Sequence, residues 1–504
     1  MWSLDLRSLA LVRILYGLLL LSDILIRATD LVAHYTDWGL APRSAVLQFS
    51  TDPVNFSLHM IGGTWPFEAV LFTIGAMASV CLTVGYQTRW AGWIAWVHLI
   101  SMHTRNPWVL DGGDIYLRSA MFWLLFTPWG ARWSIDGWRS PAAADPVERS
   151  VFSLASMCYA IQVSLVYVFA ALLKTSPEWR IDFTATYYAL MIEQLTTPLA
   201  AYMLPHPELM KHLTVLVWWF EALGPILLWL PGPFRMLGVV GISLMHLAFG
   251  SFLHLAIFAL IGASSPLGMV PGGVWDRLEK IRLWARFQEL GRRLASSWPF
   301  PGRASTKAPY PQPATDIVLA ILMIHVALWN LADLPGVHLP FPRPERLVSM
   351  LRLDQKWNMF APRPLDEDGW YVIETELVDG TKVDLYREGA PVSFEKPIRI
   401  APTYPNARWR KFMMNIWSRD NSDWRLYYGR YLTRKWNSVH SGGKLARKFT
   451  IYFMMHRTLL NGQRSDLQKV PIWNHHCFDT PEPTPTVTPT PVVAPTPGVT
   501  PTPP

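Results

Sequence analysis

The chain has few cysteines, few charged residues and none of the common catalytic signatures. Only 3 of its 504 residues are cysteine, so no disulfide framework is predicted. Charged residues make up 16%, which is low for a soluble protein of this length. The signatures of serine hydrolases, P-loop NTPases, zinc proteases and dinucleotide-binding domains are absent. The chain therefore lacks the residues that would carry the chemistry of those enzyme classes.

Metal-binding and nucleic-acid-binding patterns are weak as well. His475, His476 and Cys477 are adjacent, but they lack the spaced second pair of ligands that a zinc site needs. We therefore predict no metal. The net charge is +8, yet its densest basic stretch, residues 277–307, follows directly on apolar segments. This arrangement favours a loop of a membrane protein and argues against a nucleic-acid partner.

Apolar residues dominate the chain instead. Hydrophobic residues make up 51%, and there are 26 tryptophans, a composition typical of membrane proteins with aromatic belts at both interfaces. We predict a polytopic α-helical membrane bundle of about eight or nine spans. Several predicted spans are shorter than the roughly 20 residues that cross a bilayer, so we expect them to be tilted or broken. The predicted spans are 9–27, 66–85, 90–104, 115–128, 151–173, 212–230, 235–250, 252–268 and 315–332. Between them, residues 185–204 are predicted to be interfacial or re-entrant.

Composition divides the chain into five parts. Basic residues concentrate in the segment after the eighth span, and basic loops of membrane proteins usually lie in the cytoplasm. Nine spans then give a cytoplasmic N-terminus and an extracytoplasmic C-terminal domain. The predicted parts are a membrane bundle (1–275), a basic cytoplasmic loop (276–310), the last span with a linker (311–344), a small extracytoplasmic α+β domain (345–478) and a disordered Pro/Thr-rich tail (479–504).

The predicted C-terminal domain begins with a strand signal. The run WYVIETELVDGTKVDLY alternates apolar and polar residues around a DG pair, which is typical of a β-hairpin. We expect amphipathic helices after it, in the segments RKFMMNIWS, GRYLTRKWN and KFTIYFMMHRTLL. The domain should therefore combine strands and helices.

A few ionisable residues lie within the predicted spans, where charge is costly and functional roles are common. Arg13 and Asp23 lie in the first span, and we expect Arg13 to face the bundle and pair with an acid. Glu221 precedes Pro225 by four residues, so its carboxylate is expected to satisfy a helix kink or Arg13. We interpret these three residues as structural.

Two histidines extend this set. His246 and His254 are eight residues apart and share a helical face if the helix continues, although Gly250 and Ser251 between them favour a break. Imidazoles at a helix break can hydrogen-bond a ligand oxygen or a quinone. Well-satisfied core histidines remain the other interpretation.

Three loops on the predicted outer side are rich in Gly, Pro and Trp. They read HYTDWGLAPR, HTRNPWVLDGGD and KTSPEWRIDF, and together they are predicted to roof a cavity. In the second loop Arg105, Asp111 and Asp114 form a candidate charge network around paired glycines. The alternative is that these loops are interfacial turns that merely end helices.

Lys174 is the first charge after a long apolar run. One interpretation is an anchor, because a lysine at a helix end can reach the headgroups with its ammonium. The other is a catalytic base that desolvation keeps neutral. The residues alone leave both interpretations open.

An ordered series of motifs resembles a known family. LVRILYGLLLLSD, HYTDWGLAPR, GYQTRW, RNPWVLDGGD, ARWSIDG and ALLKTSPEW follow one another as in the horizontally transferred transmembrane domain family, named for its resemblance to the vitamin K-dependent gamma-carboxylase. The resemblance covers most of 1–270, up to LIGASSPLGM, and QKWNMFAPRP resembles the segment after the last span of bacterial members. A bacterial inner-membrane protein is the corresponding expectation.

The resemblance implies an activity and a site. The animal carboxylase has two adjacent lysines where this chain has Leu173 and Lys174, and the second, its catalytic base, matches Lys174, with Trp179 also in place. By resemblance, the substrates are a reduced vitamin K or menaquinone, O2 and CO2, with a glutamate-bearing protein as the acceptor. His246 lies in a region similar to one that holds a histidine in that enzyme. A second family histidine is missing, because Asp111 to Gly113 occupy its place, and the large lumenal domain is reduced.

Three functions remain open at this stage. The first is a gamma-carboxylase-like enzyme with Lys174 as base and a quinone cavity lined by His246, His254, Arg105, Asp111, Asp114 and Trp179. The second is a catalytically silent scaffold or sensor that presents its C-terminal domain to a partner. The third is a carrier for a lipid or a small anion.

Overall fold

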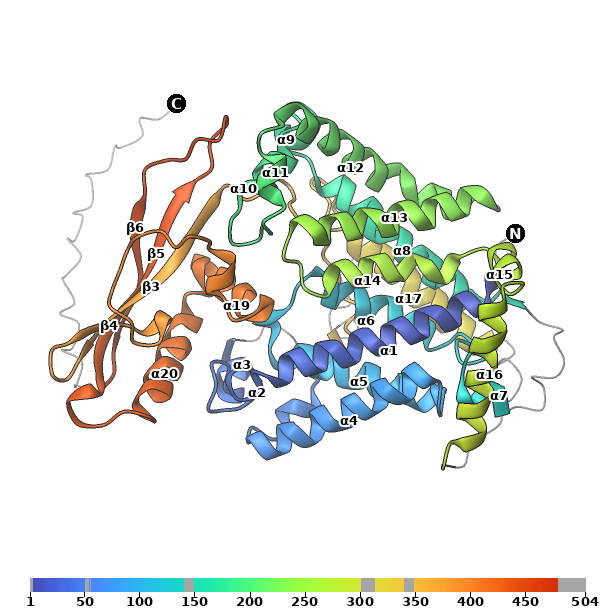
Figure 1. Ribbon diagram of the computed structural model, residues 1–504, viewed down its shortest axis with the longest axis horizontal. Helices are drawn as coiled ribbons and strands as arrows, with labels where there is room; N and C mark the ends of the chain where they lie inside the picture. Colours follow the sequence, from blue (N-terminus) through green and yellow to red (C-terminus); the bar gives the residue numbers. More distant parts are fainter. Residues whose placement is uncertain are drawn as a thin grey trace, which may run out of the picture.

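The computed structural model describes residues 3–49, 54, 56–139, 149–300, 313–339 and 349–478. A bundle of roughly parallel and antiparallel helices makes up most of the molecule, and a four-stranded sheet with two helices lies at one end of it (Figure 1). Helix α1 runs along the bundle, from the end that holds the N-terminus toward the sheet (Figure 1). The predicted tail, 479–504, lies outside the described residues.

The bundle is built from helices of very different length. They are α1 (Leu6–Ala28), α2 (Leu31–Tyr35), α3 (Arg43–Phe49), η1 (Leu58–Met60), α4 (Trp65–Val84), α5 (Thr88–Arg105), η2 (Pro107–Val109), α6 (Gly112–Leu124), α7 (Ile135–Arg139), α8 (Leu154–Leu173), α9 (Pro177–Arg180), α10 (Ala185–Met191), α11 (Ala200–Met203), α12 (Pro207–Leu227), α13 (Pro233–Phe252), α14 (Phe258–Ser264), η4 (Ser265–Met269), α15 (Gly272–Leu278), α16 (Arg282–Ser297) and α17 (Pro313–Leu331). Two short strands form an antiparallel pair: β1 (Leu4–Asp5), which precedes α1 in the chain, and β2 (Ser150–Val151), which precedes α8.

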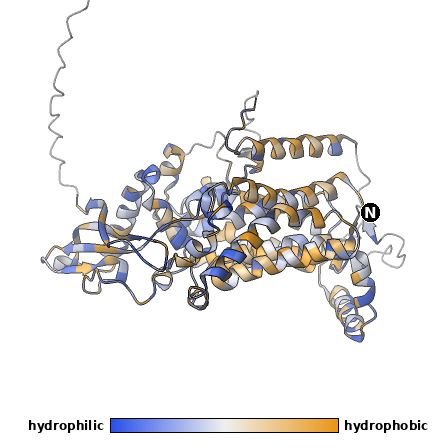
Figure 2. Ribbon diagram, turned by 90° about the horizontal axis from the view of Figure 1, so that it is seen from above, coloured by the Kyte–Doolittle hydropathy of each residue, from blue (hydrophilic) through white to orange (hydrophobic). Residues whose placement is uncertain are grey.

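Five of the described helices are long and apolar enough to cross a membrane. They are α1, α4, α8, α13 and α17. The other four predicted spans are also helical, but α6 and α14 are shorter and α5 and α12 are more polar. The chain is thus a helical integral membrane protein with five candidate spans among the described residues, and the count of about eight or nine spans stays a prediction. Hydrophobic residues concentrate along the bundle helices, whereas hydrophilic residues are frequent in the sheet region (Figure 2).

Local signals explain where the two central helices begin. The carboxylate of Asp5 accepts the amide of Arg7 and caps α1, and Ser153 and Ser156 form a reciprocal capping box at the start of α8. α8 ends at Lys174, whose backbone leaves the helical region at φ −78° and ψ 80°, three residues before Pro177. These signals place Lys174 at the end of a twenty-residue helix.

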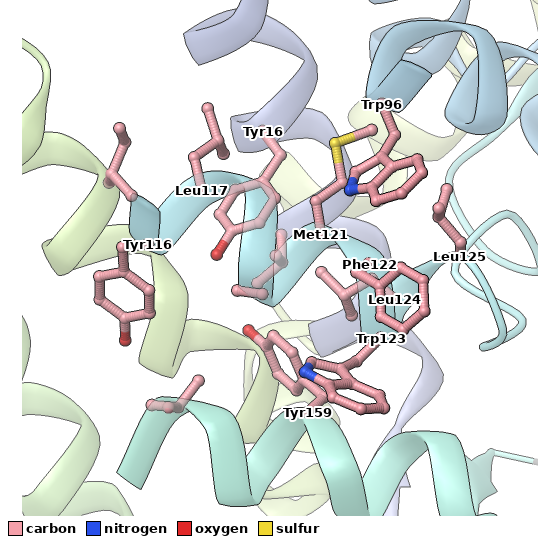
Figure 3. Packing of buried hydrophobic residues seen from close by; sticks show 14 of the residues in the cluster. Tyr16, Trp96, Tyr116, Leu117, Met121, Phe122, Trp123, Leu124, Leu125 and Tyr159 are labelled. Carbon is pink, nitrogen blue, oxygen red and sulfur yellow. The ribbon is translucent and has the colours of Figure 1, made fainter. Parts of the chain in front are cut away.

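Helix α6 forms the centre of the bundle. It has 13 residues, and nearly all of them are buried, including the charged side chains of Asp114 and Arg118, which form ion pairs. Its aromatic side chains pack with Tyr16 of α1, Trp96 of α5 and Tyr159 of α8 (Figure 3). A helix in this position is surrounded by protein, which explains why it does not need the length of a membrane span.

The C-terminal sheet domain, residues 349–478, contains an antiparallel sheet in the order β4-β3-β5-β6. The predicted hairpin is confirmed, because β3 (Glu367–Leu377) pairs with β4 (Lys382–Asp384) around Gly380, whose φ is +83°. Two predicted helices are confirmed as α19 (Ala407–Trp417) and α20 (Asp423–Asn437).

The third predicted helix is wrong. KFTIYFMMHRTLL lies largely in β5 (Ala446–Arg457), which pairs with β3 and with β6 (Gln468–His476). Phe449, Ile451 and Phe453 alternate with neighbours on the opposite face of the strand, so the period is two residues. Both faces of β5 are buried only from Phe453 to His456, where three apolar residues in a row hide the alternation.

The sheet domain is packed against the bundle. One hydrophobic core joins Trp370, Phe412 and Ile451 of the domain to Leu40 and Val109 of the bundle loops. Residues 351–359, which precede β3, also pack in the core of the bundle, where Trp357 is fully buried. The two parts therefore form one continuous body.

Candidate functional site

Lys174 lies inside the molecule and not at its surface. Its side chain is 3% exposed, and its Nζ donates to the Oε2 atom of Glu221 at 2.5 Å and to the carbonyl oxygen of Ala170 at 3.4 Å. The Nζ atom also lies 4.9 Å from the centre of the Trp179 ring. A headgroup anchor would extend its ammonium into water, so the anchor interpretation does not describe this side chain.

Glu221 reaches Lys174 from α12, and this partner differs from the one we expected. The predicted partner, Arg13, is fully buried elsewhere in the bundle. Arg13 donates to the carbonyl oxygen of Trp133 at 2.5 Å, and more weakly to those of Arg132 and Thr83. Among the described residues no carboxylate lies within ion-pair distance of Arg13, and backbone carbonyls accept from its two terminal nitrogens instead.

The loop after Lys174 is closed by the segment that follows α17. The indole nitrogen of Trp179 donates to the carbonyl oxygen of Phe360 at 2.8 Å, and the amide of Ser176 donates to that of Pro362 at 3.2 Å. Arg180 donates to the carbonyl oxygen of Lys174 at 2.8 Å. Two of the resemblance motifs, ALLKTSPEW and QKWNMFAPRP, thus meet at Lys174.

A second group of polar side chains begins two helical turns before Lys174, at Tyr167 of α8. Tyr167 is seven residues before Lys174 and therefore lies on the same side of the helix. Its hydroxyl is 3.0 Å from Nε2 of His246 and 3.4 Å from the hydroxyl of Tyr116. His246 is 3% exposed, so it is a buried histidine with a tyrosine partner. Sequence reasoning missed both tyrosines, although the seven-residue spacing in α8 was a usable signal.

His254 does not join His246. Helix α13 ends at Phe252, and the His254 side chain is exposed. Its backbone carbonyl accepts a hydrogen bond from Arg410 of α19. Partial burial, together with Arg410 and Arg399, lowers the pKa of His254 below its ordinary value. The predicted break at Gly250 and Ser251 therefore falls slightly later, and it separates the two histidines.

A buried charge cluster links α1, α6 and the sheet domain. Asp23 accepts from Arg27 and from Arg408 at 2.8 Å each, and Asp114 accepts from Arg27 at 2.6 Å and also from Arg408. All four side chains are at most 4% exposed. Burial alone would lower the pKa of the Arg408 guanidinium, but Asp114 and Asp23 raise it well above its ordinary value. Arg408 was not identified from the sequence, because it lies almost 400 residues from Asp23.

The predicted charge network in the second loop is present only in part. Asp111 caps α6 and forms a capping box with Asp114. Arg105 is fully buried but points to a different loop, where it donates to the carbonyl oxygen of Ala41 and lies 3.7 Å from Asp37. Asp114 therefore pairs with Arg27 and Arg408, and not with Arg105 as predicted.

The same cluster contains three side chains with metal-ligand atoms. Donor atoms of Asp23, His103 and Asp114 lie within 4.8 Å of one another. Arg27 and Arg408 already donate to both carboxylates. Two guanidinium groups supply the positive charge that a cation would bring, so this set does not fit a metal ion.

A cavity of about 290 Å³ lies at the other end of α8. Arg7, Arg149 and Arg235 line it together with Asp5 and Asp276. Residue 150 of its lining precedes α8, whereas Lys174 follows α8, so a twenty-residue helix of roughly 30 Å separates the two places. The cavity contains none of the predicted site residues. Comparison with protein-family models, curated proteins and solved structures finds no match for this chain.

Proposed function

We propose that this chain is a membrane enzyme of the horizontally transferred transmembrane domain family that oxidises a reduced naphthoquinone of the vitamin K type with O2. Lys174 is its base. The observation that carries the proposal is the burial of Lys174 beside Glu221, Trp179 and the face of α8 that holds Tyr167. A base of this kind has to be kept from bulk water and close to apolar surface.

Glu221 explains how a buried lysine acts as a base. Two opposite charges in a water-poor interior carry a large desolvation cost. Transfer of one proton from the Lys174 ammonium to the Glu221 carboxylate removes both charges and leaves a lone pair on Nζ. The amine then removes the phenolic proton of the hydroquinone, which starts its oxidation. Glu221 is thus a proton acceptor for Lys174 and not only a structural residue.

The remaining parts of the proposal follow from the same family. CO2 and a glutamate-bearing protein are the further substrates, with the lipid quinone entering from the bilayer. The proposed location is a bacterial inner membrane, with the N-terminus in the cytoplasm and the C-terminal sheet domain outside. His246 and Tyr167 supply hydrogen-bonding groups for a quinone oxygen.

A silent scaffold is the second candidate, and one observation favours it. The Lys174 ammonium is already paired at 2.5 Å, so the pair can serve simply to hold α8 against α12. The cluster around Arg408 in the same way holds the sheet domain on the bundle. A scaffold requires both contacts and no chemistry.

The experiment is turnover of reduced menaquinone, or of reduced vitamin K, to its epoxide by detergent-purified protein. Lys174→Ala and Glu221→Gln are compared with Lys211→Ala, which removes an exposed lysine from the same helix as Glu221. We expect epoxide from the wild type and from Lys211→Ala, and none from Lys174→Ala. Wild-type turnover by a folded Lys174→Ala variant would end the proposal. Absence of epoxide from every folded protein would favour the scaffold.

A further inference from the structure

Helix α16 lies across one end of the bundle and not along it. Figure 1 shows it running across the end that holds the N-terminus, opposite the sheet, and at a steep angle to α1. Because α1 is a candidate membrane span, a helix that crosses its end runs close to the plane of a membrane surface. The sequence predicts only a basic loop at this position.

One side of α16 is fixed to the protein. Gly291 packs so closely against the Trp138 ring that an added Cβ would lie 2.2 Å from it. Arg139 of α7 donates to the carbonyl oxygens of Ala295, Trp298 and Phe300 at 2.6 to 2.7 Å. These contacts set the rotation of the helix about its own axis.

A second side of α16 is apolar and exposed. Phe287, Leu290 and Leu294 are 40%, 58% and 53% exposed, and their spacing of three and four residues places them on one stripe. Gly291 and Ala295, the residues that face the protein, lie about a quarter turn away from this stripe. Phe287 contacts the Trp133 ring, whereas Leu290 and Leu294 stay largely uncovered by the protein while the helix itself is held in place.

The third side is strongly basic. Arg282, Arg286, Arg292 and Arg293 are exposed, and Glu289 is the only acid of the helix, which leaves a net charge of +3. Ion pairs with Glu289 are 2.9 Å for Arg293 and 3.9 Å for Arg292, and both side chains are largely in solvent. With these charges α16 cannot cross a membrane, whereas an apolar stripe bordered by arginines is typical of helices that lie at its surface.

We infer that α16 is an interfacial helix that binds anionic phospholipid headgroups. Its stripe enters the outer part of the acyl-chain region, and its arginines contact the phosphates. Positive charge on the helix complements the negative charge of acidic lipids, and the helix runs across the end of the bundle at which α1 begins. This inference does not depend on the activity proposed for Lys174.

Depth is tested by fluorescence in nanodiscs that contain the full chain. In a background of Cys81→Ala, Cys158→Ala and Cys477→Ser, an environment-sensitive dye is attached to Leu290→Cys, and to Ser296→Cys as the matched control on the solvent side. We expect lipids with brominated acyl chains to quench the dye at position 290 and not at position 296. Equal quenching at both positions, or none at position 290, would overturn the inference.

Headgroup selectivity is tested on the same protein without labels. Retention of phosphatidylglycerol relative to phosphatidylcholine is measured by native mass spectrometry for the wild type and for Arg286→Gln/Arg293→Gln. We expect the ratio of retained phosphatidylglycerol to retained phosphatidylcholine to fall about fivefold for each arginine removed. A control variant, Lys382→Gln, removes an exposed charge of the sheet domain and should retain the preference. Equal retention of both lipids by the wild type would contradict the assignment of anionic lipid.

Discussion

The ammonium nitrogen of Lys174 lies 2.5 Å from a carboxylate oxygen of Glu221, inside the helix bundle, although the two residues are 47 positions apart. Lys174 ends α8, and Glu221 precedes Pro225 in α12. Their pairing joins the two helices at the place where the loop ALLKTSPEW meets the segment after α17. The same contact thus bears on both the stability of the bundle and its proposed chemistry.

Removing one member of this pair should destabilise the protein strongly. Lys174→Met leaves the Glu221 carboxylate buried without a partner, and Glu221→Leu leaves the Lys174 ammonium buried without one. We expect each variant to lower the free energy of unfolding by about 3–5 kcal/mol. The double variant should lose much less than the sum of the two, because no charge remains. Unfolding in detergent measures all three. Lys211→Met, which breaks an exposed pair with Glu208, should leave stability nearly unchanged, because water screens the pair. Strictly additive losses would contradict the pairing.

Arg408 should be required for docking of the sheet domain. Arg408→Met leaves Asp23 and Asp114 to share the Arg27 guanidinium, with His103 as a further neighbour of Asp114, and we expect a loss of about 3–5 kcal/mol. Hydrogen exchange should rise both in α19 and in the bundle loops that α19 contacts. Arg419→Met, an exposed site in the same domain, is the control. Protection that remains at wild-type level in Arg408→Met would show that the hydrophobic core alone holds the domain.

Gly262→Ala should displace His246. An added Cβ would lie 2.2 Å from the Nδ1 atom of His246, so the ring has to move and its contact with Tyr167 is lost. Overpacking of this kind costs about 1–3 kcal/mol, which a thermal melt detects. Gly273→Ala meets no atom within 4 Å and should be neutral. If both variants melt like the wild type, the close packing around His246 is not as described.

Acid should destabilise the sheet domain partly through His475. Burial against Phe449 lowers the pKa of this imidazole to about 4, with smaller contributions from Arg430 and His476. The unfolded chain takes up this proton below about pH 6.5, so it binds more protons than the folded chain between about pH 6.5 and 4. Stability therefore falls as the pH falls through this window. His475→Gln should reduce the slope of melting temperature against pH, whereas His476→Gln, on the exposed neighbour, should not. An unchanged slope in His475→Gln would refute the assignment.

Part of the structure could be predicted from local pattern alone. Long apolar runs identified the five helices that are able to span a membrane, and the DG pair identified the hairpin at Gly380. Prediction from pattern fails in part of β5, because the strand is buried on both faces from Phe453 to His456 and the alternation of apolar and polar residues is lost there. Net charge alone predicts only a basic loop at 276–310, whereas the spacing of Phe287, Leu290 and Leu294 indicates the helix α16.

The partners of the buried charges were beyond the reach of the sequence. The sequence by itself determined that charges at Arg13, Asp23, Lys174 and Glu221 lie next to or within apolar runs and must be satisfied. Only the tertiary structure decided that Lys174 pairs with Glu221, that Asp23 pairs with Arg408, and that carbonyl oxygens accept from Arg13. Apolar periodicity records which side of a helix is buried. An ion pair depends on two side chains meeting in space, and helix packing decides that meeting from residues that can be hundreds of positions apart.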